Sequence, residues 1–173
     1  MKQMSNDFLH KYLVLDRQAR VITVFSTDVV NDYCKHVNTT PLSVATMGRL
    51  ISATLMMGSM LKGQEKVMVS IDGNGPIGVI RAESDAFGHV RAFASNPEIN
   101  LPLNDRNMLD VASAVGSEGY LSVRKQLNMK EPFIGTCELI SGEIGEDLSY
   151  YFGELNNSLV PSSLKTLKML QKV

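Results

Sequence analysis

The longest apolar stretch of the chain spans residues 40–63 and carries the signals of both ends of a helix. Thr40 suits the N-cap, Pro41 suits the first turn, where its missing N–H would have no partner, and Gly63 suits the stop after Lys62. Apolar side chains extend most of the way around the axis, which is typical of a helix that is buried on most sides. We therefore predict one long central helix around which the other elements pack.

The other apolar stretches are shorter and are bounded by turn residues. Their patterns predict strands over residues 7–16, 20–26, 67–72, 76–83, 89–95, 120–126 and 132–140. Helical patterns predict helices over residues 27–35, 111–115 and 143–155. Hairpin turns rather than βαβ crossovers separate the strands. We therefore predict an α+β fold in which an antiparallel-rich sheet packs around the long central helix.

Polar residues at two predicted helix N-termini have structural roles. Ser26 suits the cap of the helix over residues 27–35. Glu143, Glu146 and Asp147 fall in the first turn of the last helix, where negative charge matches the positive end of the helix dipole. As a solvated cluster, these acidic residues need no catalytic role.

Length and composition fit one domain of ordinary size. The chain has 173 residues, of which 44% are hydrophobic and 20% are charged, and its net charge is −1. This charge supplies no broad attraction to nucleic acid or to an anionic membrane. Arg49 and the Ser, Thr and Gly residues of the central helix argue against a membrane span. No leader pattern opens the chain, so we expect a cytoplasmic protein with no nucleic-acid and no membrane partner.

Few residues form a pattern that suggests catalysis or metal binding. The three histidines, His10, His36 and His89, have no metal-ligand spacing. Cys34 and Cys137 lie far apart and form no CxC or CxxC, so we expect two separate thiols rather than a disulfide or a zinc site. The sequence contains no nucleophile elbow and no kinase or phosphate-loop signature. The residues alone therefore indicate no catalytic site and no bound cofactor.

The Gly73 to Gly78 loop spells G-x-G-x-x-G directly after a predicted strand. A dinucleotide-binding loop of this pattern needs a following helix, whose N–H groups converge on the pyrophosphate. Pro76 and the β-branched residues after it predict a strand instead, so a glycine-rich hairpin turn is the better interpretation. A nucleotide-binding enzyme that uses this loop is the less favoured alternative.

Several short motifs between Asp7 and Phe152 resemble, in order and spacing, the heat shock protein 33 family of redox-regulated holdase chaperones. These motifs occupy residues 48–51, 60–63, 75–78, 88–91, 96–97, 101–104, 109–111, 114–116, 130–132, 141–148 and 151–152. The resemblance implies an ATP-independent chaperone that binds unfolding proteins during oxidative stress. In that family the amino-terminal domain carries the apolar client surface, and a linker and a small zinc domain cover it under reducing conditions.

The resemblance also implies a redox switch, in which a CxC and a CxxC hold zinc and their oxidation releases the metal and unfolds the linker. Those cysteines are absent from this sequence, and Cys34 and Cys137 do not match them. Residues 1–155 are therefore predicted to be a metal-free chaperone core and residues 156–173 an atypical tail. Two roles are open for the tail, as a substitute cover for the apolar sheet or as a contact with a second subunit. Its apolar residues at near-helical spacing are Leu164, Leu167 and Leu170.

Our candidate client contacts are Met68, Ile80 and Phe93, which are apolar residues on predicted strands. Adaptable apolar side chains would cover exposed segments of an unfolding client without ATP and without covalent chemistry, so no enzyme is expected. The expected partners are unfolded proteins and a second copy of the chain in a homodimer, with domain swapping as one route. The main alternative function is a structural homodimerisation module whose apolar surface is covered by its own partner.

Overall fold

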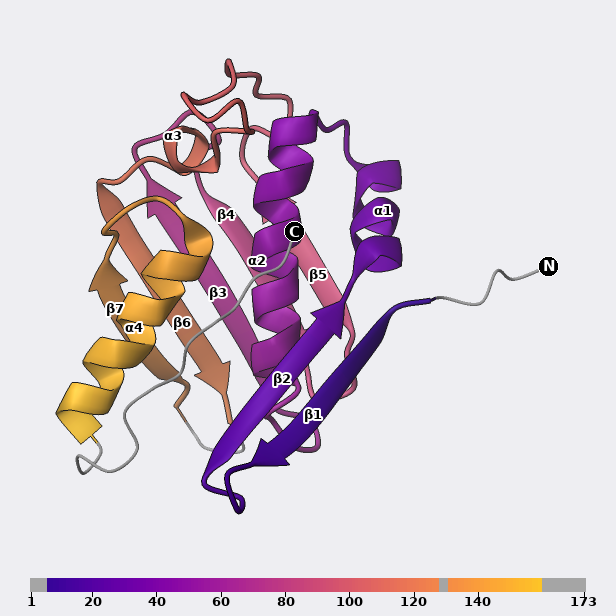
Figure 1. The fold of residues 1–173 in the computed structure, drawn as a ribbon, viewed down its shortest axis with the longest axis vertical. Coiled ribbons are helices and arrows are strands. Elements are labelled where there is room, and N and C mark those ends of the chain that lie inside the picture. The colour runs from indigo at the N-terminus through magenta and orange to yellow at the C-terminus, as the bar shows by residue number, and fades with distance from the viewer. Residues whose placement is uncertain (1–5, 128–130, 160–173) are drawn as a thin grey trace.

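A long helix, α2, runs through the molecule between two β-layers (Figure 1). The computed structural model describes residues 6–127 and 131–159, of which residues 155–159 are described by their backbone alone. The helices are α1 (Thr27–His36), α2 (Pro41–Gly58), α3 (Val111–Val115) and α4 (Ile144–Leu159). The strands are β1 (Phe8–Val14), β2 (Ala19–Phe25), β3 (Lys66–Gly73), β4 (Ile80–Asp85), β5 (Val90–Ala94), β6 (Gly119–Gln126) and β7 (Phe133–Glu138).

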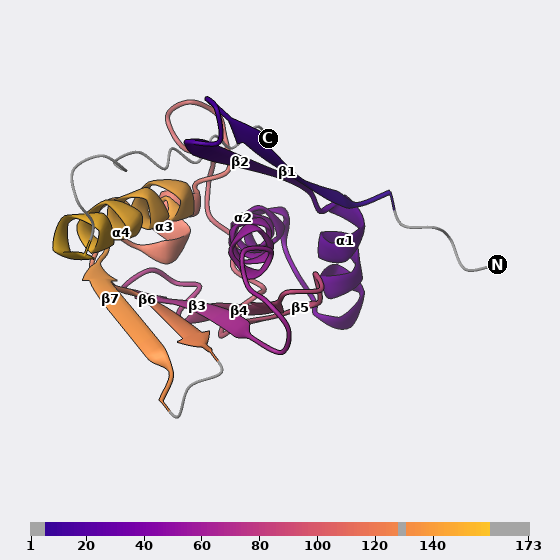
Figure 2. The same ribbon diagram turned by 90° about the horizontal axis from the view of Figure 1, so that it is seen from below.

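Five strands form one antiparallel sheet, and the first two form a separate hairpin. The order in the sheet is β5-β4-β3-β6-β7, and β1 pairs only with β2 in the described part of the chain. Figure 2 shows α2 between the sheet and the hairpin, with the other helices on the same side of the sheet as α2. The predicted α+β fold, with an antiparallel-rich sheet around a long central helix, is therefore confirmed.

The alternation of side chains along the strands decides which face of the five-stranded sheet is buried. Inward residues of the central strands are fully buried, such as Val69 and Ile80 beneath α2 and Val123 on β6, which contacts α4. On the opposite face, none of the described helices or strands packs against the sheet (Figure 2). The sheet thus has one core face and one outer face.

The central helix ends at Gly58 rather than at the predicted Lys62. Its start is as predicted, because the Oγ1 of Thr40 accepts a hydrogen bond from the Ser43 N–H at 3.3 Å. Gly58 lies so close to β4 that a Cβ at this position would stand 2.5 Å from the Oγ of Ser84. Beyond Gly58 the N–H groups of Met60 and Leu61 donate to carbonyls three residues back, at 3.1 and 2.9 Å, so the α-helical hydrogen bonding stops there, which the helical pattern does not show.

The first helix is capped by a residue that lies far away in the sequence. The Asp7 carboxylate accepts hydrogen bonds from the N–H groups of Asp28 and Val29 at 3.0 and 2.8 Å. Ser26 makes no capping hydrogen bond, and its hydroxyl lies 2.8 Å from that of Ser52 instead. Ser26 therefore stands at the N-cap position as predicted, but Asp7 supplies the capping hydrogen bonds, because the fold of the hairpin against α1 brings Asp7 to the helix N-terminus.

Most of the other predicted elements lie close to their predicted bounds. The strand predicted over residues 76–83 begins only at Ile80, because the loop before it bonds to α3. Helix α4 continues to Leu159, so the predicted boundary at residue 155 falls within a helix, and the division into core and tail stays a prediction. The tail residues with two open roles, Leu164, Leu167 and Leu170, lie outside the described residues.

Candidate functional site

The Gly73 to Gly78 loop joins β3 to β4 and lies against α3. The N–H of Gly75 donates to the Val115 carbonyl at 2.9 Å, and the N–H of Ile77 donates to the Ala114 carbonyl at 3.1 Å. The next element is β4, so no helix N-terminus follows the loop. The hairpin interpretation is confirmed. Because protein carbonyls already occupy these amides, the loop lacks the convergent N–H groups that a pyrophosphate needs.

The three candidate client contacts lie in different environments. Ile80 is fully buried, because it lies on the inward face of β4 opposite Ile71. Its assignment as a client contact is therefore wrong, since it belongs to the core. Met68 is half-buried, Phe93 is 55% exposed, and both belong to the outer face of the sheet. The role of these two side chains in client binding stays a prediction.

Charged residues separate the apolar ones on the outer face of the sheet. Met68 lies between Glu83 and Arg124 on the neighbouring strands. Phe93 lies opposite Arg81, which donates to a serine hydroxyl of β3 at 3.2 Å. This face therefore offers isolated apolar contacts rather than a continuous apolar patch.

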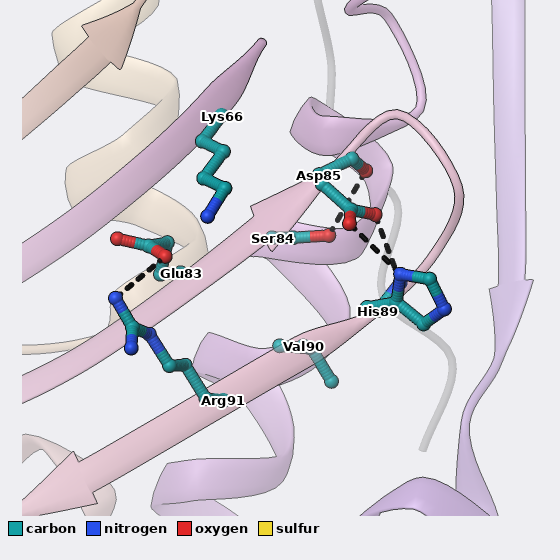
Figure 3. A pocket seen from close by; sticks show the side chains of 7 residues that line it. All are labelled: Lys66, Glu83, Ser84, Asp85, His89, Val90 and Arg91. Atoms are coloured by element: carbon teal, nitrogen blue, oxygen red, sulfur yellow. Dashed lines mark hydrogen bonds and ion pairs between the residues drawn. The ribbon is translucent and has the colours of Figure 1, made fainter. Parts of the chain in front are cut away.

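An open pocket lies where β3, β4 and β5 meet, and its charges are largely paired (Figure 3). Glu83 pairs with Arg91 at 2.8 Å, and Asp85 pairs with the His89 ring at 2.8 Å. Burial alone would raise the pKa of Asp85, but hydrogen bonds from the His89 ring and from backbone N–H groups hold that pKa below its usual range. These pairs connect β4 to β5 across the turn between the two strands.

The β1–β2 hairpin presents a larger apolar surface. Of its inward side chains, Val24 packs against the core, Lys11 donates to the Ser59 carbonyl just beyond the end of α2, and Leu13 is 59% exposed. Its outward side chains form a row across both strands, which we call the aromatic ladder. The members of the aromatic ladder are Phe8, His10, Tyr12, Val14, Val21, Thr23 and Phe25.

Ring contacts hold the aromatic ladder together. The Phe8 ring stacks on that of Phe25, with centroids 5.6 Å apart, and on the imidazole of His10 at 4.7 Å. The Tyr12 hydroxyl is hydrogen-bonded to Nδ1 of His10 at 3.0 Å. No member of the ladder carries a fixed charge. The five apolar or aromatic members are each 38% to 48% exposed: Phe8, Tyr12, Val14, Val21 and Phe25.

Sequence reasoning missed the aromatic ladder, although the sequence contains a signal for it. Both strands of the hairpin, predicted over residues 7–16 and 20–26, carry apolar residues on both faces. A two-stranded hairpin beside one central helix can bury only one face, so the apolar residues of the other face are left in solvent. That signal becomes readable only when the hairpin is known to stand apart from the main sheet.

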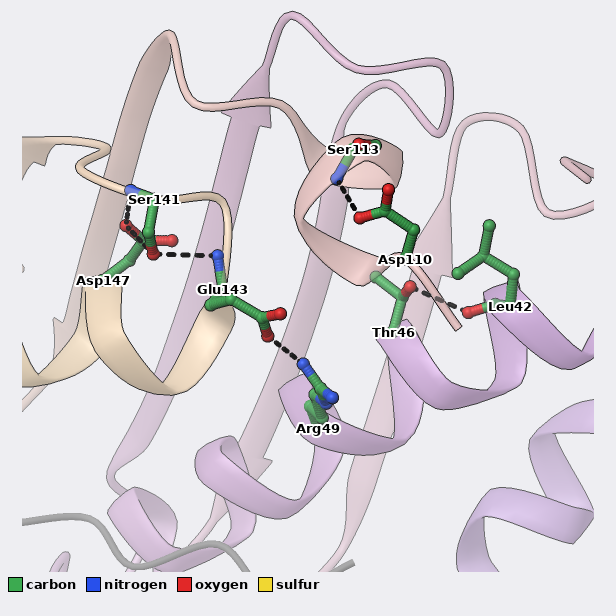
Figure 4. A network of polar contacts seen from close by, with 8 residues as sticks. All are labelled: Leu42, Thr46, Arg49, Asp110, Ser113, Ser141, Glu143 and Asp147. Carbon is green, nitrogen blue, oxygen red and sulfur yellow. Dashed lines mark hydrogen bonds and ion pairs between the residues drawn. The ribbon is translucent and has the colours of Figure 1, made fainter. Parts of the chain in front are cut away.

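A polar network ties α4 to α2 and to the end of β7 (Figure 4). Arg49 of α2 forms an ion pair with Glu143, which directly precedes α4. The Glu143 N–H donates to the Ser141 hydroxyl at 3.0 Å. The Asp147 carboxylate accepts from the N–H groups of Ile140 and Ser141 at 2.9 and 3.0 Å. The network therefore holds α4 in place against α2 and the end of β7.

Three titratable groups where α4 packs on β7 have raised pKa values: Asp147 and Tyr151 of α4 and Cys137 of β7. Asp147 is fully buried, which corrects the expectation of a solvated acidic cluster. Burial raises the pKa of Asp147, and its hydrogen bonds from Ile140 and Ser141 offset the shift only in part. Burial likewise raises the pKa of Cys137 to about 11 and that of Tyr151 to about 12. Cys137 is therefore a protonated, unreactive thiol at neutral pH.

The two cysteines are free thiols on elements at opposite sides of the molecule, Cys34 on α1 and Cys137 on β7 (Figure 1). Among the described residues, no group of three or more His, Cys, Asp or Glu side chains is placed to hold a metal ion. In the same part of the chain, no helix combines the length and the apolarity that a bilayer crossing demands.

Comparison with known proteins places this fold and its sequence in a family. The model of the Hsp33 protein family matches residues 7–156. The chain belongs to the Hsp33 family. This membership confirms the resemblance that the short motifs indicate.

The matches to Hsp33 relatives cover most of this chain but only about half of each relative's length. The 33 kDa chaperonin of Bacillus subtilis (strain 168) is 44% identical over 158 residues, which are 91% of this chain and 54% of the relative. That of Staphylococcus haemolyticus (strain JCSC1435) is 43% identical over 161 residues, 93% of this chain and 54% of the relative. The chain therefore spans about half the length of the curated relatives it matches.

A solved Hsp33 structure supports the fold directly. The crystal structure of the 33 kDa chaperonin from Thermotoga maritima matches with a TM-score of 0.80 and 34% sequence identity. The match covers 84% of this chain and 50% of that chain. The zinc that the Hsp33 resemblance implies has no fitting set of ligands among the described residues, and Cys34 and Cys137 lie too far apart in the fold to share a metal ion.

Proposed function

We propose that this chain is the client-binding core of an Hsp33 chaperone, which holds unfolding proteins without ATP and without a chemical step. The observation that carries the proposal is the aromatic ladder, an uncharged row of half-exposed apolar side chains supported by the central helix. Such a surface gains free energy when it covers apolar segments that a client exposes as it unfolds. The name 33 kDa chaperonin, which the relatives carry, supports the same function.

The size of the aromatic ladder suits reversible holding. Its three half-exposed aromatic rings and two valines present roughly 400 Å² of surface, given ~150–250 Å² for a whole aromatic side chain. At ~25 cal/mol per Å², covering this surface contributes about 10 kcal/mol before the costs of association and of client ordering are subtracted. Those costs are of similar size, so a client would be held weakly and released without an energy source.

The proposal also includes secondary client contacts on the outer face of the sheet, the partners of the chain and its location. Met68 and Phe93 are secondary client contacts, because each is a partly exposed apolar side chain on the outer face of the sheet. The chain acts in the cytoplasm, with unfolded proteins and a second copy of itself as partners. It uses no cofactor. It binds neither nucleic acid nor membrane, because its net charge of −1 gives no broad attraction to either.

Activity of this chain needs no oxidant. Cys137 is held as a neutral thiol with a pKa of about 11, and it lies on the opposite side of the molecule from Cys34. These two thiols are therefore poorly placed to form a redox switch with each other.

An aggregation assay tests the function. A model enzyme is denatured by heat and its light scattering is followed with increasing amounts of the chain, in the absence of ATP and of oxidant. We expect scattering to fall progressively and to be suppressed by a several-fold molar excess of the chain. An inert protein of similar size at the same concentrations is the control. Scattering that stays at the control level even at tenfold excess would show that this chain is no holdase.

A further inference from the structure

The hairpin combines the aromatic ladder with an open strand edge. Strand β1 pairs with β2 over seven residues without a bulge, and it pairs with no other strand among the described residues. Proteins commonly guard such an edge with a proline, a bulge or a charged side chain, which can also point inward. Strand β1 contains no proline, and the ammonium group of its one charged residue, Lys11, donates to the Ser59 carbonyl. Lys11 is thus the one such guard on β1, and the outer N–H and C=O groups of the strand have no strand partner among the described residues.

We propose that an extended, uncharged segment of an unfolding client binds by adding to the free edge of β1 as a third strand. Every second side chain of that segment then lies on the outward face of the hairpin, beside the aromatic ladder. This inference rests on the proposed function and specifies the class of client segment. Backbone hydrogen bonds of the added strand are independent of its sequence, and the ladder selects apolar side chains at every second position. With seven residues in β1, the bound segment is about 23 Å long at ~3.3 Å per residue.

The size of the aromatic ladder favours a single strand over a second copy of the chain. Its roughly 400 Å² of exposed apolar surface, estimated from ~150–250 Å² per whole aromatic side chain, is about half of the ~800 Å² that each partner buries in a stable interface. A single strand needs only the ladder and the edge of β1. The lack of fixed charge on the ladder selects an uncharged segment, because a charged side chain would lose its water there without gaining a partner.

The edges of the five-stranded sheet fit this occupant less well. Edge strand β5 carries Arg91, which pairs with Glu83 on the outer face. On edge strand β7, the exposed Ile134 lies opposite Arg124. Neither edge continues into an uncharged apolar face, whereas the edge of β1 does.

Labelled peptides test the binding mode with the full 173-residue chain. The first peptide has nine residues that alternate Phe or Val with Thr, followed by two solubilising lysines. The second has the same composition, with its apolar residues in one block. The third is the alternating peptide with N-methyl groups on alternate residues, which remove the N–H groups of one strand edge and keep every side chain. We expect fluorescence anisotropy to show at least tenfold weaker binding of the second and third peptides.

Matched substitutions locate the site. Tyr12→Ser and Phe25→Ser remove exposed rings of the aromatic ladder, and each should weaken binding of the alternating peptide at least fivefold. Tyr120→Ser is the control, because Tyr120 is similarly exposed, at 55% against 48% for Tyr12, but belongs to β6 of the main sheet. The control should bind the peptide like the unchanged chain. Circular dichroism verifies that each variant is folded.

The outcomes separate this inference from the proposed function. Equal binding of the N-methylated and unmethylated peptides, or an equal loss with Tyr120→Ser, would overturn strand addition at β1. If the chain suppresses aggregation and shows either of those results, the holdase function stands and its clients bind elsewhere or in another way. If the peptides behave as expected and aggregation is not suppressed, strand addition stands and the holdase function is wrong.

Discussion

Asp147 is a buried carboxylate with a structural role. One of its oxygens accepts hydrogen bonds from the N–H groups of Ile140 and Ser141, and the other has no partner. Those bonds hold the turn between β7 and α4. Burial disfavours the charged form, so the pKa of Asp147 is raised even though the hydrogen bonds oppose the shift. The oxygen atom is needed at this position, but the negative charge is not.

Two substitutions separate the oxygen from the charge. Asp147→Asn keeps an oxygen acceptor for the two N–H donors and removes the charge, so we expect stability equal to or above that of the unchanged chain at pH 7. Asp147→Ala leaves the donors without an acceptor and should cost ~1–3 kcal/mol of unfolding free energy. Urea unfolding monitored by circular dichroism measures both.

The pH dependence of these variants follows from the raised pKa of Asp147. The folded state favours the protonated form of Asp147. This contribution to stability is fully present below the ordinary Asp pKa of ~3.9, and the unchanged chain loses it as the pH rises through the raised pKa of Asp147. Any advantage of Asp147→Asn should therefore shrink as the pH is lowered from 7 toward 4. An Asn variant that is as unstable as the Ala variant at every pH would contradict this account.

At the scale of elements, the contact between α2 and β4 requires glycine at the last residue of the central helix. A Cβ at Gly58 would stand 2.5 Å from the Ser84 hydroxyl oxygen and 2.8 Å from the Asp85 carbonyl oxygen. The helix can approach the strand this closely only with glycine at its last residue. Gly48, earlier in the same helix, has more room, since its Cβ would lie 3.7 Å from the methyl groups of Val30.

These two glycines give a matched pair of substitutions. Gly58→Ala forces α2 away from β4 and should destabilise the protein by ~1–3 kcal/mol, the usual range for overpacking. Gly48→Ala makes ordinary van der Waals contact and gains helix propensity, so it should stabilise the protein by ~0.5–1 kcal/mol. Thermal unfolding of the two variants should move the midpoint in opposite directions. A midpoint that is unchanged by Gly58→Ala would show that the close approach does not matter.

At the scale of the whole molecule, the arrangement of two β-layers around one helix leaves two sheet faces in water. The outer face of the five-stranded sheet is a mixture of apolar and charged residues, and the outer face of the hairpin is apolar and uncharged. The edge strand β7 adds a third feature, since its residues from Phe133 to Cys137 carry no charged side chain. Such an edge can pair with the same edge of a second copy.

The homodimer that forms part of the proposed function can be tested at the β7 edge. We expect light scattering to give a mass of twice 19.0 kDa at micromolar concentration. Ile134→Lys places a charge on the edge strand at an exposed position and should weaken the dimer at least tenfold. Phe93→Lys makes the same change on β5 and should leave the dimer intact. A monomer at all concentrations would exclude the homodimer, and equal effects of the two variants would exclude the β7 edge as its interface.

The sequence by itself determined the elements, the fold class and the family. Apolar periodicity, caps and turn residues act between near neighbours, so they could be read without a structure, as Thr40 at the start of α2 illustrates. The motifs that indicate Hsp33 are likewise short and local.

Only the tertiary structure decided which apolar side chains reach water. Ile80 and Phe93 both lie on strands, yet one faces α2 and the other faces solvent, because the face that a helix covers depends on how distant segments pack. The same reason applies to the cap that Asp7 supplies to α1 and to the burial of Asp147. The aromatic ladder exists because β1 and β2 cross the central helix as a separate hairpin, and the apolar residues on both faces of these strands do not reveal that placement by themselves.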